Sequence, residues 1–224
     1  AIVEQISTIA QKQGIPKVRS IWMPPLPESI ILESMLNAGK PVIGLVDDPG
    51  RQMQYPLAVD FYKNGHLSIF GAPSSGKTTL LKTMIVSICR TYSPEECCVY
   101  AIDFGSRALG SLEEFPNVGG VVMVDEAERL KNLLKFIIKH IDHRKAIFSN
   151  AGVSNFASYR LSTGSLLAMI VLVIDNYPAL LEVYPETEEL LVQITREGSN
   201  LGVYVVLTAN TLGAVKYRIA ANFK

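Results

Sequence analysis

Two glycines, a lysine and a threonine stand at fixed spacing in the segment 71–78 of the 224-residue chain. Gly71 and Gly76 permit positive φ angles and close approach of the backbone to an anion. Backbone amides there, and at the start of a following helix, point toward phosphate groups. Lys77 supplies a charge for the β- and γ-phosphates, and Thr78 supplies a hydroxyl ligand for Mg²⁺. The pattern predicts a phosphate-binding P-loop for Mg²⁺ and ATP, made by Gly71, Ala72, Pro73, Ser74, Ser75, Gly76, Lys77, Thr78 and Thr79.

A second acidic position follows an apolar run. The segment 170–174 contains only Ile, Val and Leu, and it ends at Asp175. Ligands of parallel sheets gather at the carboxyl ends of the strands. We therefore expect Asp175, at the end of a strand neighbouring the P-loop strand, to hold the Mg²⁺ shell together with Thr78. The alternative is an aspartate that caps the next segment.

The residue after Asp175 bears on catalysis. Many hydrolysing P-loop proteins place Glu there, where it orients and deprotonates the attacking water. This chain has Asn176, whose carboxamide can hold a water but cannot accept its proton at neutral pH. With Lys77, Asp175 and Asn176 as the catalytic set, the prediction is ATP binding with slow or no hydrolysis.

Further polar residues are candidates at the same site. Asp103, Thr208 and Asn210 each follow or end an apolar run and could sense the γ-phosphate, or they could form turns and caps. An arginine finger cannot be assigned from the sequence. Its candidates also form surface ion pairs in many proteins, and they are Arg160, Arg196 and Arg218.

The elements that position these residues alternate between strands and helices. Apolar strands are expected at 42–46, 56–60, 66–70, 97–102, 120–124, 166–174 and 203–207. Helices are expected after the P-loop and at 126–148, with a short one at 109–114 and a turn at 63–65. Near-continuous apolar strands separated by helices predict an α/β fold. With the P-loop, the expectation is a RecA-like NTPase whose mostly parallel sheet has helices on both faces.

Residues 1–40 are expected to form a linker extension, and residues 41–224 the ATPase domain. The extension holds a helical pattern at 1–13, a proline-rich extended segment at 21–27 and a short helical stretch at 28–39. It offers too little apolar surface for its own core. Trp22 either staples the extension to the domain or fills a substrate groove as a plug.

Composition disfavours several classes of protein. Lys and Arg total 21 against 21 Asp and Glu, so no overall field attracts nucleic acid or acidic lipid. Three cysteines, Cys89, Cys97 and Cys98, have neither disulfide nor metal spacing and are expected to be reduced thiols. The longest apolar run is about half a membrane span. The chain is expected to be soluble as given. A soluble piece of a membrane-anchored protein is equally compatible with these patterns, and the start without Met fits excision.

The residues also resemble a family. The P-loop, the Tyr-Ala-Ile-Asp-Phe-Gly segment at 100–105, segment 152–159, Ile174-Asp175-Asn176 and Thr208-Ala209-Asn210 are similar to FtsK/SpoIIIE-type ATPases. Within that family, the Trp-Met-Pro-Pro-Leu-Pro linker at 22–27 and the ending at 222–224 resemble the tandem ATPase domains of the type VII secretion motors EssC and EccC. The preceding linker indicates a later domain, the last of the tandem.

The resemblance implies a domain on the cytoplasmic face of the membrane, within a membrane-anchored chain that can form hexamers. Its implied partners are the other ATPase domains, membrane proteins of the secretion machinery, and small helical WXG-type substrates with a carboxy-terminal export signal. Asn176 departs from the usual acid, and the chain ends before the elements expected to complete the sheet. The alternative reading is a DNA translocase motor, which the zero net charge disfavours. A third is a module that ATP merely stabilises.

Overall fold

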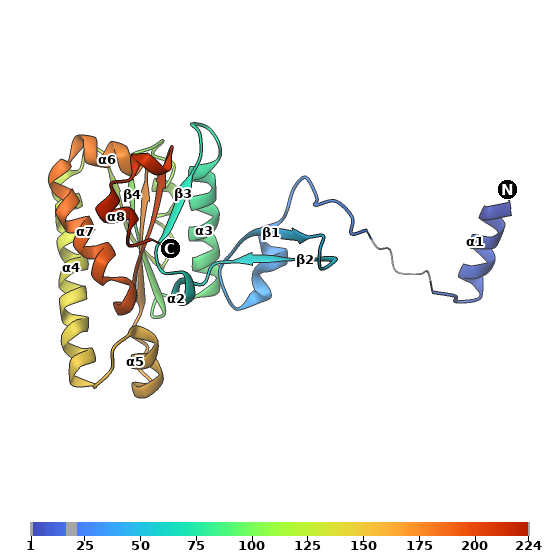
Figure 1. Ribbon diagram of the computed structural model, residues 1–224, viewed down its shortest axis with the longest axis horizontal. Coiled ribbons are helices and arrows are strands. Elements are labelled where there is room, and N and C mark those ends of the chain that lie inside the picture. The colour runs from blue at the N-terminus through green and yellow to red at the C-terminus, as the bar shows by residue number, and fades with distance from the viewer. Residues whose placement is uncertain (1, 17–21, 224) are drawn as a thin grey trace.

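A five-stranded parallel sheet forms the centre of the protein (Figure 1). The computed structural model describes residues 2–16 and 22–223. Across the sheet the strand order is β3 (Leu67–Phe70), β7 (Val203–Ala209), β6 (Met169–Asp175), β4 (Cys97–Asp103) and β5 (Val118–Met123). Every neighbouring pair is parallel. Every residue of β6 and β7 is buried, as expected for strands covered on both faces.

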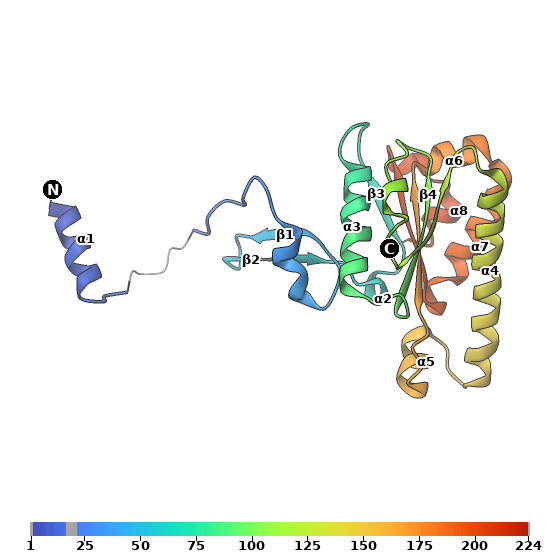
Figure 2. The same cartoon turned by 180° about the vertical axis from the view of Figure 1, so that it is seen from behind.

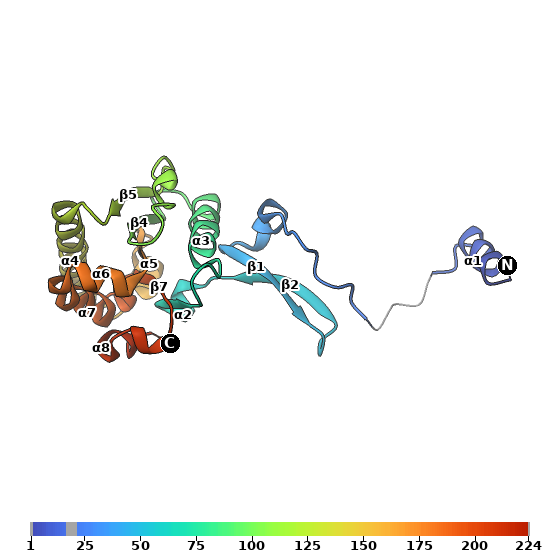
Figure 3. The same cartoon turned by 90° about the horizontal axis from the view of Figure 1, so that it is seen from above.

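Helices cover both faces of this sheet, as predicted. Helix α3 (Lys77–Thr91) lies on one face, and α4 (Ala127–Asn150), α6 (Tyr177–Val183) and α7 (Glu188–Glu197) lie on the other (Figure 3). The apolar stripe of α4 faces inward, because Leu130, Leu134, Ile137 and Ile141 are all buried. These layers bury one continuous apolar core.

The first two strands do not join the central sheet. β1 (Val42–Asp48) and β2 (Met53–Ala58) form an antiparallel hairpin beside α3 (Figure 3). Pro56 fits there because β2 pairs on one side only. The hairpin is attached to α3 by a hydrogen bond of 2.7 Å from Val42 N to Ser87 Oγ.

Several boundaries differ from the sequence prediction. The second hairpin strand starts at Met53 instead of Pro56, and the turn expected at 63–65 is largely helix α2 (Phe61–Asn64). The apolar run at 166–174 does not begin as a strand, since Leu166 is exposed and β6 starts at Met169. In these places apolar character alone did not mark the ends of the elements.

The sequence prediction also missed short helices. These are α5 (Phe156–Thr163), α6, α7 and α8 (Tyr217–Ala220). Local signals for α5 exist, because Asn155 Oδ1 accepts from Ser158 N at 2.9 Å and Gly164 ends the helix with a φ of 64°. A seven-residue 3₁₀ helix lies at Leu32–Ala38. Single 3₁₀ turns lie at Gly110–Leu112, Pro185–Thr187, Ser199–Leu201 and Leu212–Ala214.

The amino-terminal extension carries helix α1 (Ile2–Lys12), whose apolar side chains Ile2, Val3, Ile6 and Ile9 are exposed. The expected extended segment at 21–27 begins outside the described residues. Trp22 is 82% exposed and lies with Met23 beside the hairpin turn. Gln54 Nε2 donates to Pro24 O at 2.7 Å. Trp22 is therefore largely exposed in this structure, and the extension is attached to the hairpin through Pro24. The two roles weighed for Trp22 stay predictions. Among the described residues, no helix is long and apolar enough to cross a membrane.

Two buried polar side chains hold the amino-terminal ends of the strands. The Arg144 guanidinium donates to Leu201 O, Gly202 O and Ala168 O, at the entries to β7 and β6. His66, just before β3, accepts from Val205 N through Nδ1 at 2.9 Å, so its Nε2 donates to Thr195 O at 2.8 Å. Burial lowers the pKa of His66 to about 4.

The buried His66 makes stability depend on pH. Its folded pKa lies below the unfolded value, so its contribution is present above about pH 6.5 and is lost as the pH falls toward 4. In denaturant unfolding, the free-energy cost of His66→Gln should shrink by about 2–3 kcal/mol between pH 7.5 and pH 4.5. His143→Gln, at an exposed position on α4, is the control. If the difference in unfolding free energy between wild type and His66→Gln did not change with pH, His66 would not be a neutral imidazole with a lowered pKa in the folded protein.

Candidate functional site

The P-loop connects β3 to α3 at the carboxyl edge of the sheet (Figure 2). Its backbone has positive φ angles of 61° at Ser74 and 91° at Gly76. A Cβ on Gly71 would lie 2.5 Å from Ser75 Oγ, so a side chain there would require the Ser75 hydroxyl to move. Ala72 through Gly76 are exposed, as is Thr79 in the first turn of α3. The loop is therefore curled, open to solvent and followed by a helix amino terminus, which is the arrangement expected for phosphate.

Lys77 lies at the start of α3 with its ammonium group turned back into the loop. Its Nζ donates to Gly71 O at 2.8 Å, to Ala72 O at 3.0 Å and to Asn210 Oδ1 at 3.1 Å. These acceptors are two backbone carbonyls and a neutral amide. An incoming phosphate would offer the ammonium a charged partner, and charge-assisted hydrogen bonds are the stronger ones.

Asp175 lies beneath the loop in a network of hydroxyl groups. Its Oδ2 accepts from Thr78 Oγ1, and its Oδ1 accepts from Thr208 Oγ1, both at 2.7 Å. Asp175 is 2% exposed and Thr208 is fully buried. The Thr208 hydroxyl also accepts from Asn176 N at 2.8 Å. The structure thus brings together Thr78 and Asp175, the two residues expected to hold a metal.

The strand order corrects one expectation. β6, which carries Asp175, is not adjacent to the P-loop strand, because β7 lies between β3 and β6. The end of β7 is therefore at the centre of the site. This explains why Thr208 reaches Asp175 and Asn210 reaches Lys77. For both residues the position predicted at the site is confirmed.

Asn176 adopts a left-handed conformation with φ and ψ of 61°, directly before α6. It makes no side-chain cap to that helix. Instead its Nδ2 donates to Phe104 O at 3.2 Å, in the loop after β4. The carboxamide is therefore bonded to the protein backbone.

Asp103 proves to be a structural residue. Its Oδ1 accepts from Gly105 N and Arg107 N, and its Oδ2 accepts from Leu109 N at 2.9 Å. With both oxygens occupied and 1% exposure, this carboxylate shapes the loop after β4. The turn-forming alternative is correct for Asp103, and a γ-phosphate sensor there is not supported.

The three arginine candidates are all engaged on the surface. Arg160 Nη1 donates to Tyr62 OH on α2, Arg196 pairs with Glu197, and Arg218 pairs with Glu189. Helix α5, which carries Arg160, lies at the end of the sheet opposite the P-loop (Figure 2). None of the three has a recorded contact with the P-loop residues or Asp175.

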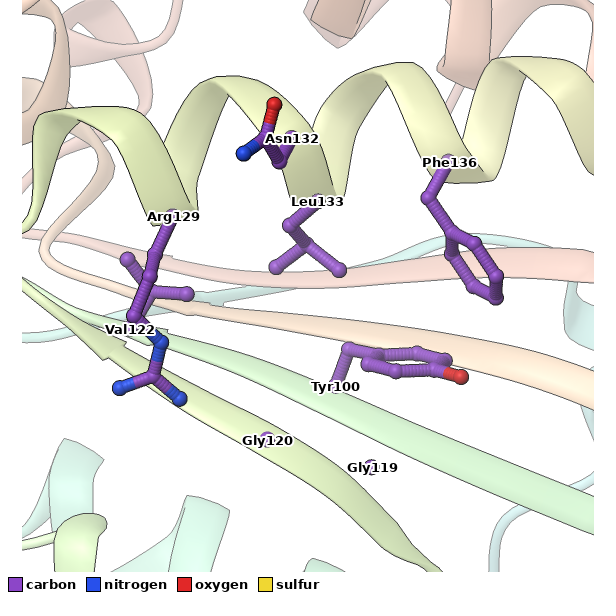
Figure 4. A pocket seen from close by; sticks show the side chains of 8 residues that line it. All are labelled: Tyr100, Gly119, Gly120, Val122, Arg129, Asn132, Leu133 and Phe136. Carbon is purple, nitrogen blue, oxygen red and sulfur yellow. The ribbon is translucent and has the colours of Figure 1, made fainter.

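A separate groove of about 390 Å³ lies between α4 and the outermost strand β5 (Figure 4). Gly119 and Gly120 leave the strand bare at its floor. A Cβ on Gly119 would lie 2.4 Å from the Tyr100 ring, so glycine is required for this packing. Phe136 meets the Tyr100 ring edge-on at 5.4 Å, and Arg129 pairs with Glu113 and Glu126. Sequence analysis did not identify this groove.

Taken together, the parallel sheet, the curled loop and the Thr78–Asp175 pair define a P-loop ATPase domain. Residues 32–216 match the FtsK/SpoIIIE family. The chain belongs to this family, and membership implies nucleotide binding with a divalent metal.

Known relatives show which members of the FtsK/SpoIIIE family the chain is similar to. The chain is 32% identical over its whole length to the type VII secretion system protein EssC of Staphylococcus aureus, and it spans 16% of that protein's length. Two solved structures from Thermomonospora curvata are also similar. The cytoplasmic domain of the type VII secretion ATPase EccC has 29% identity and a TM-score of 0.84, with 92% of this chain and 27% of that one covered. EccC ATPases 2 and 3 in complex with a signal sequence peptide have 30% identity and a TM-score of 0.76, with 82% and 35% covered. The chain is thus an ATPase domain of the EssC/EccC type.

The Thr208 hydroxyl should be important for stability. Thr208→Val removes one donor from buried Asp175 and one acceptor from Asn176 N, and it should lower the free energy of unfolding by about 2–4 kcal/mol. Thr208→Ser keeps the hydroxyl and should cost about 1 kcal/mol for the lost methyl group. Chemical denaturation measures both. Equal losses for the two variants would show that the hydroxyl contributes little.

Proposed function

We propose that this domain binds Mg²⁺–ATP at the P-loop and hydrolyses it slowly or not at all, as part of a type VII secretion motor. The observation that carries the proposal is the convergence of Lys77, Thr78, Asp175 and Asn210 from three elements onto one edge of the sheet. Lys77 would contact the β- and γ-phosphates, and the open amides of residues 71–76 would surround them.

The oxygen atoms at the site suit a magnesium ion. Mg²⁺ prefers hard oxygen ligands and retains several waters. The Thr78 hydroxyl and the Asp175 carboxylate lie 2.7 Å apart and form such a donor pair. Bound there, the ion would neutralise charge on the phosphates. The direct hydrogen bond between the two residues keeps the buried carboxylate satisfied.

Slow hydrolysis follows from the chemistry of position 176. A general base has to accept a proton from the attacking water. The Asn176 carboxamide cannot do so at neutral pH, and its Nδ2 is already bonded to Phe104 O. Asp103 is equally unsuited, because its oxygens accept three backbone amides. The site favours holding the nucleotide over turning it over.

Nucleotide affinity and turnover test this proposal together. Calorimetry should detect ATP binding to the wild type and a loss of at least about 100-fold, equivalent to about 3 kcal/mol, in Lys77→Ala. Lys82→Ala, on the same helix but outside the loop, is the control. Steady-state turnover should be far below one per second, and protein purified without added nucleotide should retain ATP. Turnover near one per second that Lys77→Ala abolishes would refute the slow-hydrolysis part.

For partners, we propose the export signals of small helical WXG-type proteins. The support is the similar structure of EccC ATPases 2 and 3 in complex with a signal sequence peptide. We further propose that the domain works beside other ATPase domains of a longer chain and with membrane proteins of the secretion machinery. The proposed assembly is a hexamer at the cytoplasmic face of the membrane. The support for both is the similarity to EssC and EccC.

A binding comparison separates this function from DNA translocation. Fluorescence anisotropy should detect a labelled export-signal peptide and no duplex DNA at low salt, where phosphate contacts are strongest. Lys77→Ala should change peptide affinity if nucleotide and substrate are coupled, and leave it unchanged if ATP only stabilises the fold. Tight DNA binding without peptide binding would favour the translocase alternative.

A further inference from the structure

The loop after β4 lies directly on the carboxylate expected to serve the cation. A Cβ on Gly105 would lie 2.6 Å from Asp175 Oδ2 and 3.2 Å from its Cγ. Only a residue without a side chain allows the backbone to approach the carboxylate this closely. The Thr78 and Thr208 hydroxyls bond to the two oxygens of Asp175. The carboxylate is therefore surrounded by these two hydroxyls and by the backbone at Gly105.

Two hydrogen bonds join this loop to the end of β6. Phe104 N donates to Asp175 O at 3.1 Å, and Asn176 Nδ2 donates to Phe104 O at 3.2 Å. The first is a backbone bond that any residue can make. The second depends on a side-chain donor at position 176. A glutamate there would bring an acceptor to the Phe104 carbonyl, which is also an acceptor.

The backbone at position 176 also indicates a specific role for asparagine. A φ of 61° is uncommon for residues other than glycine, and asparagine tolerates it better than most. The side chain does not cap α6. The carboxamide instead contacts Phe104 O.

The loop is connected to the rest of this edge of the sheet. The Phe104 ring packs edge-on against Tyr184 at 5.8 Å, and Tyr184 OH donates to Val124 O at 2.8 Å. Arg107 in the same loop has a φ of 58° and pairs with Asp125. The loop is thus a defined segment that contacts its surroundings at both ends.

We infer that Asn176 is a positioning residue that latches the 104–109 loop over Asp175 and so opposes cation-dependent nucleotide binding. The inference rests on the proposed function, because it concerns the same Mg²⁺–nucleotide site. The hydration shell of a cation near Thr78 and Asp175 needs space at Oδ2, where Gly105 now lies. Releasing Phe104 O from Asn176 removes one of the bonds that hold the loop against Asp175 and so weakens this cover. Asparagine at position 176 therefore has two effects. It provides no general base for hydrolysis, and it keeps the Asp175 carboxylate covered by the loop.

The test compares nucleotide affinity with and without the cation. Asn176→Gly removes the latch, keeps the backbone bond to Thr208, and suits the left-handed conformation. For a non-hydrolysable ATP analogue, the Kd in EDTA divided by the Kd in excess Mg²⁺ should rise about 3- to 10-fold, as expected for one hydrogen bond. Hydrogen exchange of the amides at 104–109 should accelerate. Gln52→Gly relieves a φ of 52° in the distant hairpin and should leave the ratio unchanged.

The outcomes separate the inference from the proposed function. Wild-type binding that depends on Mg²⁺, with the same ratio in Asn176→Gly, would overturn the latch and leave the nucleotide site standing. Asn176→Ala, which lacks the donor but keeps a Cβ in the strained conformation, should raise the ratio as glycine does, with lower stability. Wild-type protein that binds no nucleotide in either condition would overturn both the proposed function and the latch.

Discussion

The site depends on satisfying one buried carboxylate. Asp175 is withdrawn from water, so each of its oxygens needs a hydrogen-bond donor, and two threonine hydroxyls from different elements supply them. That requirement fixes the positions of α3, β6 and β7 relative to one another at the edge where the P-loop begins. Gly71 N donates to Ala209 O at 3.3 Å and adds a backbone connection between the loop and β7. The placement of Lys77 beside Asn210 follows from the same arrangement.

Much of the fold could be predicted because its signals are local and strong. The P-loop spacing, the apolar runs of β6 and β7 and the stripe of α4 each follow from residue type and periodicity. The order of the strands could not be read in this way, since it depends on which faces pack together in three dimensions. The position of β7 between β3 and β6, and hence the direct bond from Thr208 to Asp175, therefore appears only in the structure.

Asp103 and Asn176 show why the chemistry of polar residues is harder to predict than their position. Both were placed correctly at the carboxyl ends of strands, where ligands gather. Asp103 nevertheless uses both oxygens for the backbone of its own loop, and Asn176 bonds to that loop from the next strand. A hydrogen-bond partner six residues away in sequence, or 72 residues away, leaves no mark in composition or spacing. The groove beside β5 could not be predicted from the sequence either, because two adjacent glycines alone do not indicate a cavity.

The bond between Val42 and Ser87 has a mechanical consequence. Ser87 lies near the end of the helix whose first residue is Lys77, and Val42 is the first residue of the hairpin that follows the linker extension. A helix of 15 residues is a stiff rod about 22 Å long. Five side chains of this helix, Ser87 among them, are buried against the rest of the protein, so the P-loop and the hairpin are both attached to one firmly packed element. The P-loop and the chain that enters the hairpin are thus held at a distance set by the length of one helix.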